Sequence, residues 1–167
     1  MAKVRQPVHY QPISPDLVAR IRRSALPVGL GQLGLTILAT VAVVFVAVRW
    51  APQLPLIGMM VALQAAAVIE GFTVGVIIVS LPERVASGYL DRNAAFAARR
   101  NVTVLWLAGL AVTMLSFGML PLALSINFGK VQVGLDLLLA GLLPALVLAV
   151  YGGFATFFVR RVVPRLS

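Results

Sequence analysis

The chain has 167 residues, of which 60% are hydrophobic and only 11% charged. A soluble domain carries about 25% charged residues, so this composition excludes an ordinary soluble globular fold. The net charge of +9 is typical of nucleic-acid-binding proteins. Here, however, the basic residues flank apolar runs instead of forming a face, so we predict a lipid bilayer and no nucleic acid as partner.

The residue types needed for metal or redox chemistry are scarce. The chain has no cysteine and one histidine, His9, close to its first residue. Disulfides, iron–sulfur clusters, thiolate zinc sites and a bis-histidine haem are therefore excluded for this chain alone. We predict no metal, no cofactor of its own and no catalytic residues. A quinone, lipid or pigment bound at an interface shared with other subunits stays open.

Residues 1–24 are expected to form a cytoplasmic tail. The Ser-Pro-Asp sequence at 14–16 predicts a helix start, because serine caps and proline suits the first helical position. Leu17, Val18 and Ile21 then recur on one face, which predicts a short amphipathic helix on the inner leaflet; a simple positive flank is the alternative. The arginines expected to meet anionic lipid headgroups are Arg20, Arg22, Arg23, Arg99 and Arg100.

Residues 25–159 are expected to form the membrane domain, which contains four apolar runs. Each exceeds the ~20 residues that a helix needs to cross a bilayer, and backbone at that depth must be helical because lipid offers no hydrogen-bond partner. The first run is also longer than the apolar part of a signal peptide, so we expect it to be retained. The predicted spans are Ala25–Val48, Leu54–Leu81, Val102–Leu124 and Leu135–Val159.

The predicted fold class is thus all-α: a polytopic membrane protein built as a four-transmembrane-helix bundle with short interfacial helices. Orientation follows from the basic residues. Twelve of the 14 lie in the N-terminal tail, the loop 82–101 and the tail 160–167, and the other two are Arg49 and Lys130. Since positive residues favour the cytoplasmic side, we predict a multi-pass protein of the cell (inner) membrane with both termini in the cytoplasm.

The loop 82–101 follows Leu81. Val85 and Tyr89 are spaced as neighbours on one side of a helix, which predicts an interfacial helical hairpin arm; a passive linker is the alternative. The two tryptophans, Trp50 and Trp106, are expected to anchor helices at the membrane interface. Pro121 and Pro144 should kink the third and fourth spans, because each removes a backbone donor.

Glu70 is the only acidic residue deep within a predicted span. An ionised carboxylate there costs about 2.5–3.5 kcal/mol on insertion scales. The group should therefore be protonated, paired, or in contact with water. No basic residue lies within the core of any predicted span, so an ion pair inside this chain is not expected. Glu70 is read either as a proton or cation site, or as a protonated donor that holds its helix to another helix or subunit.

Several polar residues are predicted to surround Glu70. Counting at 1.5 Å per residue from the inner span ends places Thr36 and Thr113 at about the depth of Glu70. Gln32, Thr36 and Thr40 share one helix face, and Thr73 lies one turn from Glu70. The predicted intramembrane polar cluster is Glu70, Thr36, Thr113, Gln32, Thr40 and Thr73.

Small residues recur at four-residue spacing on the second and fourth spans. Such stripes let helix backbones approach closely in lipid, either within the bundle or at a dimer interface. The residues assigned to helix packing are Ala67, Gly71, Gly75, Gly141, Ala145, Ala149 and Gly153.

These features favour a small non-enzymatic integral membrane subunit, an accessory, assembly or stabilising component that binds other integral membrane subunits as a homo- or hetero-oligomer. The alternative is a small oligomeric transporter or channel that uses Glu70. An intramembrane enzyme is disfavoured, because it needs paired carboxylates, a nucleophile with a base, or metal ligands.

Overall fold

The computed structural model describes residues 10–50, 55–126, 135 and 137–163. Over these residues the chain is almost entirely helical, with one short strand pair. The elements are β1 (Tyr10–Pro12), α1 (Pro15–Trp50), α2 (Pro55–Val79), α3 (Leu81–Arg84), β2 (Tyr89–Asp91), α4 (Arg92–Ile126), the π-helix η1 (Leu138–Leu142) and α6 (Leu143–Val162). The sequence predictions for His9 and Lys130 concern residues outside these ranges.

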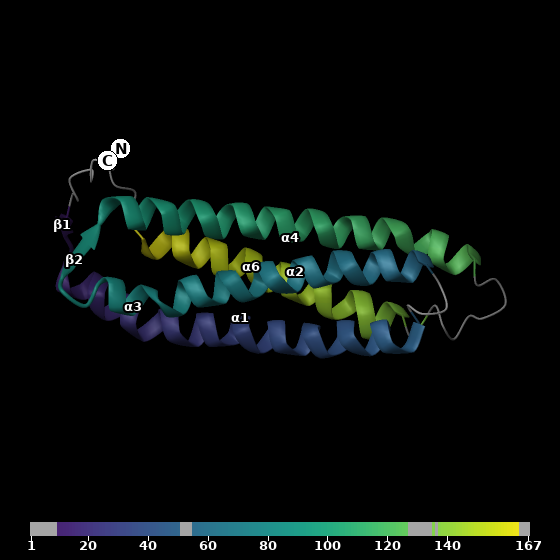
Figure 1. Cartoon of the computed structure of the whole chain (residues 1–167). Helices are drawn as coiled ribbons and strands as arrows, with labels where there is room; N and C mark the ends of the chain where they lie inside the picture. The colour runs from purple at the N-terminus through teal and green to yellow at the C-terminus, as the bar shows by residue number, and fades with distance from the viewer. Residues whose placement is uncertain (1–9, 51–54, 127–134, 136, 164–167) are drawn as a thin grey trace, which may run out of the picture.

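The long helices form an antiparallel bundle (Figure 1). α1 packs against α2 and α6, and α4 packs against the same two helices. The strands β1 and β2, the short helix α3 and the C-terminal end of α6 lie together at one end of the bundle (Figure 1), which we call the strand end. Within the described residues, four helical segments are long and apolar enough to cross a membrane. The all-helical fold and the number of candidate spans are thereby confirmed.

Two of the helices are longer than a membrane requires. α1 has 36 residues and α4 has 35, so each is more than 50 Å long at about 1.5 Å per residue. The hydrocarbon layer measures about 30 Å. Both helices begin ten residues before the predicted span starts, at Pro15 instead of Ala25 and at Arg92 instead of Val102. The extra length of both helices lies at the strand end.

The start of α1 is as predicted, but its course differs from the prediction. Ser14 Oγ accepts a hydrogen bond from the Leu17 N–H at 3.3 Å, as expected of a capping serine. The helix then continues into the first span, so the separate amphipathic helix on the membrane surface was wrong. The physical reason is that Ile21 is buried in the strand-end core, with Leu17 and Val18 packed against it. The apolar face is covered by protein.

The predicted helical hairpin arm after the second span is also wrong. α3 is a single turn, Gly88 takes a φ of 76°, a left-handed conformation that favours glycine, and the chain enters β2. Tyr89 and Asp91 pair with Pro12 and Tyr10 in antiparallel register. α4 follows at once, because Asp91 Oδ1 accepts hydrogen bonds from the N–H groups of Asn93 (2.8 Å) and Ala94 (3.3 Å).

The bundle interior contains two separate apolar cores. The first lies at the strand end and includes Ile21, Ile78 and Val159. The second lies at the opposite end and includes Trp50 and Leu142. Trp50 is buried there, so its predicted role as an interface anchor was wrong. Between the two cores, buried polar side chains such as Gln32, Gln64 and Thr113 lie among small and apolar residues.

A π-helix interrupts the fourth span next to its proline. η1 ends at Leu142, and its last turn is closed by a hydrogen bond from the Leu143 N–H to the Leu138 carbonyl. Pro144 follows in the first turn of α6. Since proline has no N–H to donate to the preceding turn, the helix widens at this point. The sequence predicted a disturbance at Pro144 but not its form.

Candidate functional site

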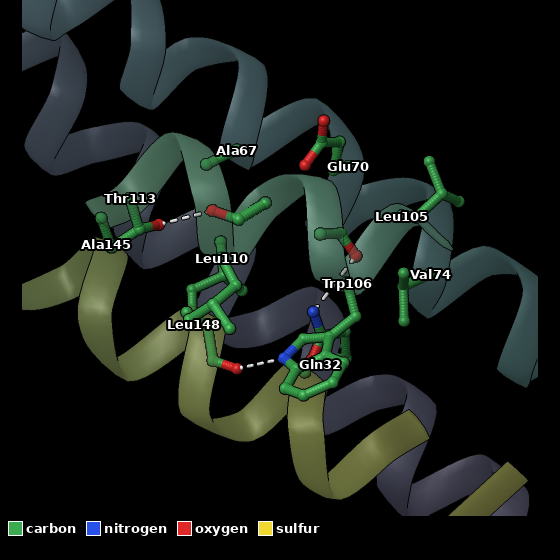
Figure 2. Close-up of a pocket in the computed structure, with 14 residues that line it drawn as sticks. Gln32, Ala67, Glu70, Val74, Leu105, Trp106, Leu110, Thr113, Ala145 and Leu148 are labelled. Carbon is green, nitrogen blue, oxygen red and sulfur yellow. Dashed lines mark hydrogen bonds between the residues drawn. The ribbon is translucent and has the colours of Figure 1, made fainter. Parts of the chain in front are cut away.

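A partly open cavity lies between the two cores, and all four long helices contribute to its lining (Figure 2). The space open to the centre of a water molecule measures about 20 Å³, enough for about one water. The polar lining comes from Gln32 of α1, Glu70 of α2, and Trp106 and Thr113 of α4. α6 supplies small and apolar residues, among them Ala145.

Glu70 lies at the seam between α2 and α4. Its side chain is half-buried, and a Cβ atom added at Gly109 of α4 would lie 2.8 Å from Glu70 Oε2. The carboxyl group therefore uses the space that the missing side chain of Gly109 leaves. Oε2 is buried and accepts or donates no hydrogen bond within the described residues. Figure 2 shows one carboxyl oxygen directed toward the cavity and the other away from it.

Gln32 crosses from α1 to the backbone of α2. Its side chain is 1% exposed, and Nε2 donates a hydrogen bond to the Gly71 carbonyl at 3.4 Å. Its Oε1 is buried without a partner among the described residues. The cavity thus has two buried oxygens with unmet hydrogen-bonding capacity, one on Gln32 and one on Glu70.

The predicted threonine ladder does not hydrogen-bond to Glu70. Thr36 donates to the Gln32 carbonyl (2.8 Å) and Thr40 to the Thr36 carbonyl (2.7 Å). Thr113 donates to the Gly109 carbonyl (2.8 Å), and Thr73 to the Ile69 carbonyl of its own helix (2.9 Å). Of the predicted cluster, the structure brings Gln32, Glu70 and Thr113 to the cavity. Thr36 lies beside Gly71, whereas Thr40 and Thr73 do not line the cavity.

Trp106 is part of this site and not a membrane-interface anchor, so that prediction was wrong. Its Nε1–H donates to the Ala149 carbonyl at 2.8 Å. A Cβ atom at Gly152 or Gly153 would lie 3.0–3.1 Å from the indole ring. Two adjacent glycines of α6 therefore admit the ring between α4 and α6, where it forms one wall of the cavity.

Sequence reasoning missed three buried polar residues: Gln64, Ser116 and Thr156. Gln64 is 2% exposed, and both polar atoms of its carboxamide lack a partner among the described residues. It lies against Gly141 in the π-helix. Its spacing could have indicated this position. Gln64 is seven residues, about two helical turns, before Gly71, so the two residues lie on the same face of the helix.

The small residues assigned to helix packing face the bundle interior. Added Cβ atoms at Gly71 and Gly75 would meet Thr36, Leu148 and Leu33 at 2.7–3.0 Å. The three alanines of the set are all buried. They are Ala67, Ala145 and Ala149.

None of the described arginine side chains lines the cavity. Arg20, Arg22, Arg23 and Arg100 are exposed toward the strand end, and Arg99 is half-buried. Arg160 Nε donates to Thr103 Oγ1 at 3.2 Å, linking α6 to α4. Among the described residues, no three histidine, cysteine, aspartate or glutamate side chains come close enough to hold a metal ion.

Fold and site together define a class: an all-helical protein with four helices suited to crossing a membrane and one carboxyl group beside a cavity between two apolar cores. The chain matches no known family model, no curated protein and no solved structure.

Proposed function

We propose that this chain is a small, non-enzymatic integral membrane subunit that assembles with, or stabilises, other integral membrane proteins. The four apolar helices support residence in a bilayer. Their outer surfaces carry large exposed apolar side chains such as Ile69, Phe72 and Leu107. Exposure of such a surface to water is unfavourable, whereas contact with lipid or with another transmembrane helix is favourable.

The observation that carries the proposal is the position of Glu70. It lies near the middle of the candidate membrane span Leu56–Arg84, is only half-buried, and has one carboxyl oxygen directed away from the cavity (Figure 2). A polar group facing lipid at that depth is unfavourable and is usually paired within the membrane. A transmembrane helix of another subunit, with a hydrogen-bond acceptor at the same depth, would cover the α2–α4 seam and accept a hydrogen bond from the protonated carboxyl group.

The proposed setting is the cell (inner) membrane with both termini cytoplasmic. The support is the distribution of arginines: Arg20, Arg84 and Arg160 are exposed toward the strand end, whereas Arg49 lies near the other end of α1. The strand end then faces the cytoplasm, where anionic headgroups would bind the predicted arginine set.

The test is purification of the tagged full-length chain from its own membranes in mild detergent, with mass spectrometry of the proteins that accompany it. We expect a membrane protein at fixed stoichiometry with the wild type and with Glu70→Gln, which keeps shape and a hydrogen-bond donor. Glu70→Ala should lose it. The matched control is Glu83→Ala, which removes an exposed carboxyl group at the strand end and should retain the partner.

Two results would contradict this function. One is a wild-type chain that runs without any stoichiometric companion. The other is loss of the companion to the same extent in Glu70→Gln and Glu70→Ala, which would mean that the negative charge and not a donor or the side-chain shape is needed.

A second candidate function is a small oligomeric transporter or channel, and the cavity beside Glu70 is the observation that favours it. Since four helices form a narrow bundle, a conducting path would need a dimer or larger ring. Proteoliposomes that contain the chain would show ion or proton flux, and Glu70→Gln would abolish it. Flux that survives this substitution with its pH dependence intact excludes Glu70 as the carrier.

A further inference from the structure

The cavity contains two oxygens that the described protein leaves unsatisfied. Gln32 Oε1 and Glu70 Oε2 are both buried and both lack a hydrogen-bond partner among the described residues. Both residues line the same cavity. A buried acceptor without a donor is destabilising, and the hydrocarbon chains of lipid cannot supply the missing donor.

The other polar groups of the lining already have partners. The Trp106 indole N–H donates to the Ala149 carbonyl, and the Thr113 hydroxyl donates to the Gly109 carbonyl. Gln32 Nε2 donates to the Gly71 carbonyl. The remaining lining residues are apolar or glycine. Examples are Val74, Leu105 and Ala145.

The missing donors must therefore come from within the cavity. We propose that the cavity is a hydrated proton-binding site, in which internal water donates hydrogen bonds to the buried oxygens of Glu70 and Gln32 and the Glu70 carboxyl group carries a proton. The cavity is large enough for about one water molecule. Glu70 Oε2 and Gln32 Oε1 are available as its hydrogen-bond acceptors. Among the described lining residues, Glu70 is the one titratable side chain.

The surroundings favour a proton over a metal cation. α1 presents Gln32 to the cavity and α4 presents Trp106 and Thr113, all uncharged, whereas α6 presents only apolar and glycine residues. Hard divalent cations take about six or more oxygen ligands. The side-chain oxygens of the described lining belong to Gln32, Glu70 and Thr113 alone, and the space is too small for a hydrated ion. A proton needs only the carboxyl group.

This site rests on the same protonated Glu70 carboxyl group as the proposed function but does not require a partner, because water would contact the buried oxygen and a partner helix would contact the other. It is therefore tested on the full-length chain alone, in lipid nanodiscs at neutral pH. Infrared spectroscopy should detect the C=O stretch of a protonated carboxylic acid. The band should shift in D₂O and disappear in Glu70→Gln. The other acidic residues, Asp16, Glu83, Asp91 and Asp136, lie outside the spans or at their ends.

The coupling to Gln32 provides the sharper test. Gln32→Leu should move the Glu70 band to higher frequency, since it removes one partner of the internal water, and the band should remain. Gln64→Leu is the matched control: it removes an equally buried glutamine from the same bundle, but Gln64 does not line the cavity. It should leave the Glu70 band in place. Circular dichroism checks that each variant is folded.

Several results would overturn the proposal. These are the absence of a protonated carboxylic acid band in the wild type, a band that sodium chloride but not choline chloride removes, and a folded Gln32→Leu variant with an unmoved band. An equal shift in Gln64→Leu would also overturn it. If Gln32→Leu does not fold, the wild-type protein still tests the proposal. Exchange into H₂¹⁸O should shift an O–H stretching band of internal water. The absence of such a shift would mean that the cavity is dry.

Discussion

At the scale of single residues, the interior of this bundle depends on positions where one side chain fills the space that another lacks. Glu70 lies over Gly109, and the Trp106 ring lies over Gly152 and Gly153. In each case a large or polar side chain on one helix faces glycine on the next. The glycines leave room for the Trp106 indole N–H to reach the Ala149 carbonyl and for the Glu70 carboxyl group to reach the cavity. A larger side chain in place of the glycine would fill that space.

Trp106 allows this arrangement to be tested. Trp106→Phe keeps an aromatic ring but loses the hydrogen bond to Ala149, and we expect a loss of about 0.5–1.5 kcal/mol of unfolding free energy. Trp106→Ala empties the site and should cost about 3–5 kcal/mol. Thermal unfolding in detergent, followed by circular dichroism, measures both. If neither variant loses stability, Trp106 faces lipid and the indole is not part of the core.

At the scale of elements, the close contact between α1 and α2 is made by glycines of both helices. A Cβ atom at Gly29 would lie 2.6 Å from Val79 Cγ2 and 3.0 Å from the Val79 backbone nitrogen. Gly75 faces Leu33 in the same way. Because one of the atoms that Gly29 faces is backbone, a larger residue could be accepted only by moving the helices apart.

Two substitutions on α1 separate close packing from helix propensity. Gly29→Ala should destabilise the protein by about 1–3 kcal/mol, the usual cost of overpacking. Gly34→Ala is the control, since an added Cβ there meets nothing within 4 Å, and alanine is the better helix former by about 1 kcal/mol. Thermal unfolding in detergent should show a lower midpoint for the first and an equal or higher one for the second. Equal midpoints would show that α1 and α2 are not in close contact.

The start of α4 depends on a single carboxylate. Asp91 Oδ1 caps two N–H groups of the first turn, so Asp91→Ala should cost about 0.5–2 kcal/mol. Asp91→Asn keeps a capping oxygen and should be nearly neutral. Hydrogen exchange of residues 92–96 should rise in the alanine variant alone. A rise of the same size in both variants would show that the negative charge, and not the cap, holds the helix start.

At the scale of the whole molecule, the charge asymmetry between the two ends of the bundle predicts its orientation. The natural chain has no cysteine, so each introduced cysteine is unique. Ser87→Cys, exposed near the strand end, and Arg49→Cys, exposed near the other end of α1, place one label at each end. A membrane-impermeant maleimide added to intact cells should label Arg49→Cys, and label Ser87→Cys only after the membrane is opened. The reverse pattern would contradict cytoplasmic termini.

The sequence by itself was sufficient for the helical class of the fold, because apolar runs of this length are candidates for membrane-spanning helices. Runs of more than about 20 apolar residues cannot leave backbone groups unpaired in hydrocarbon, so the four helical spans followed from composition and length alone. The same rule singled out Glu70, since a carboxyl group in such a run is conspicuous whatever its neighbours are.

Only the tertiary structure decided which helix faces which, and this is where the sequence predictions failed. Depth along each helix can be counted from the sequence, and Gln32, Glu70 and Thr113 do line one cavity. Rotation about each helix axis depends on packing between helices. It turned Glu70 toward Gly109, turned Trp106 inward, and covered the apolar start of α1 with the strand end. Hydropathy is the same whether an apolar face meets lipid or protein, so only the packed bundle distinguishes the two.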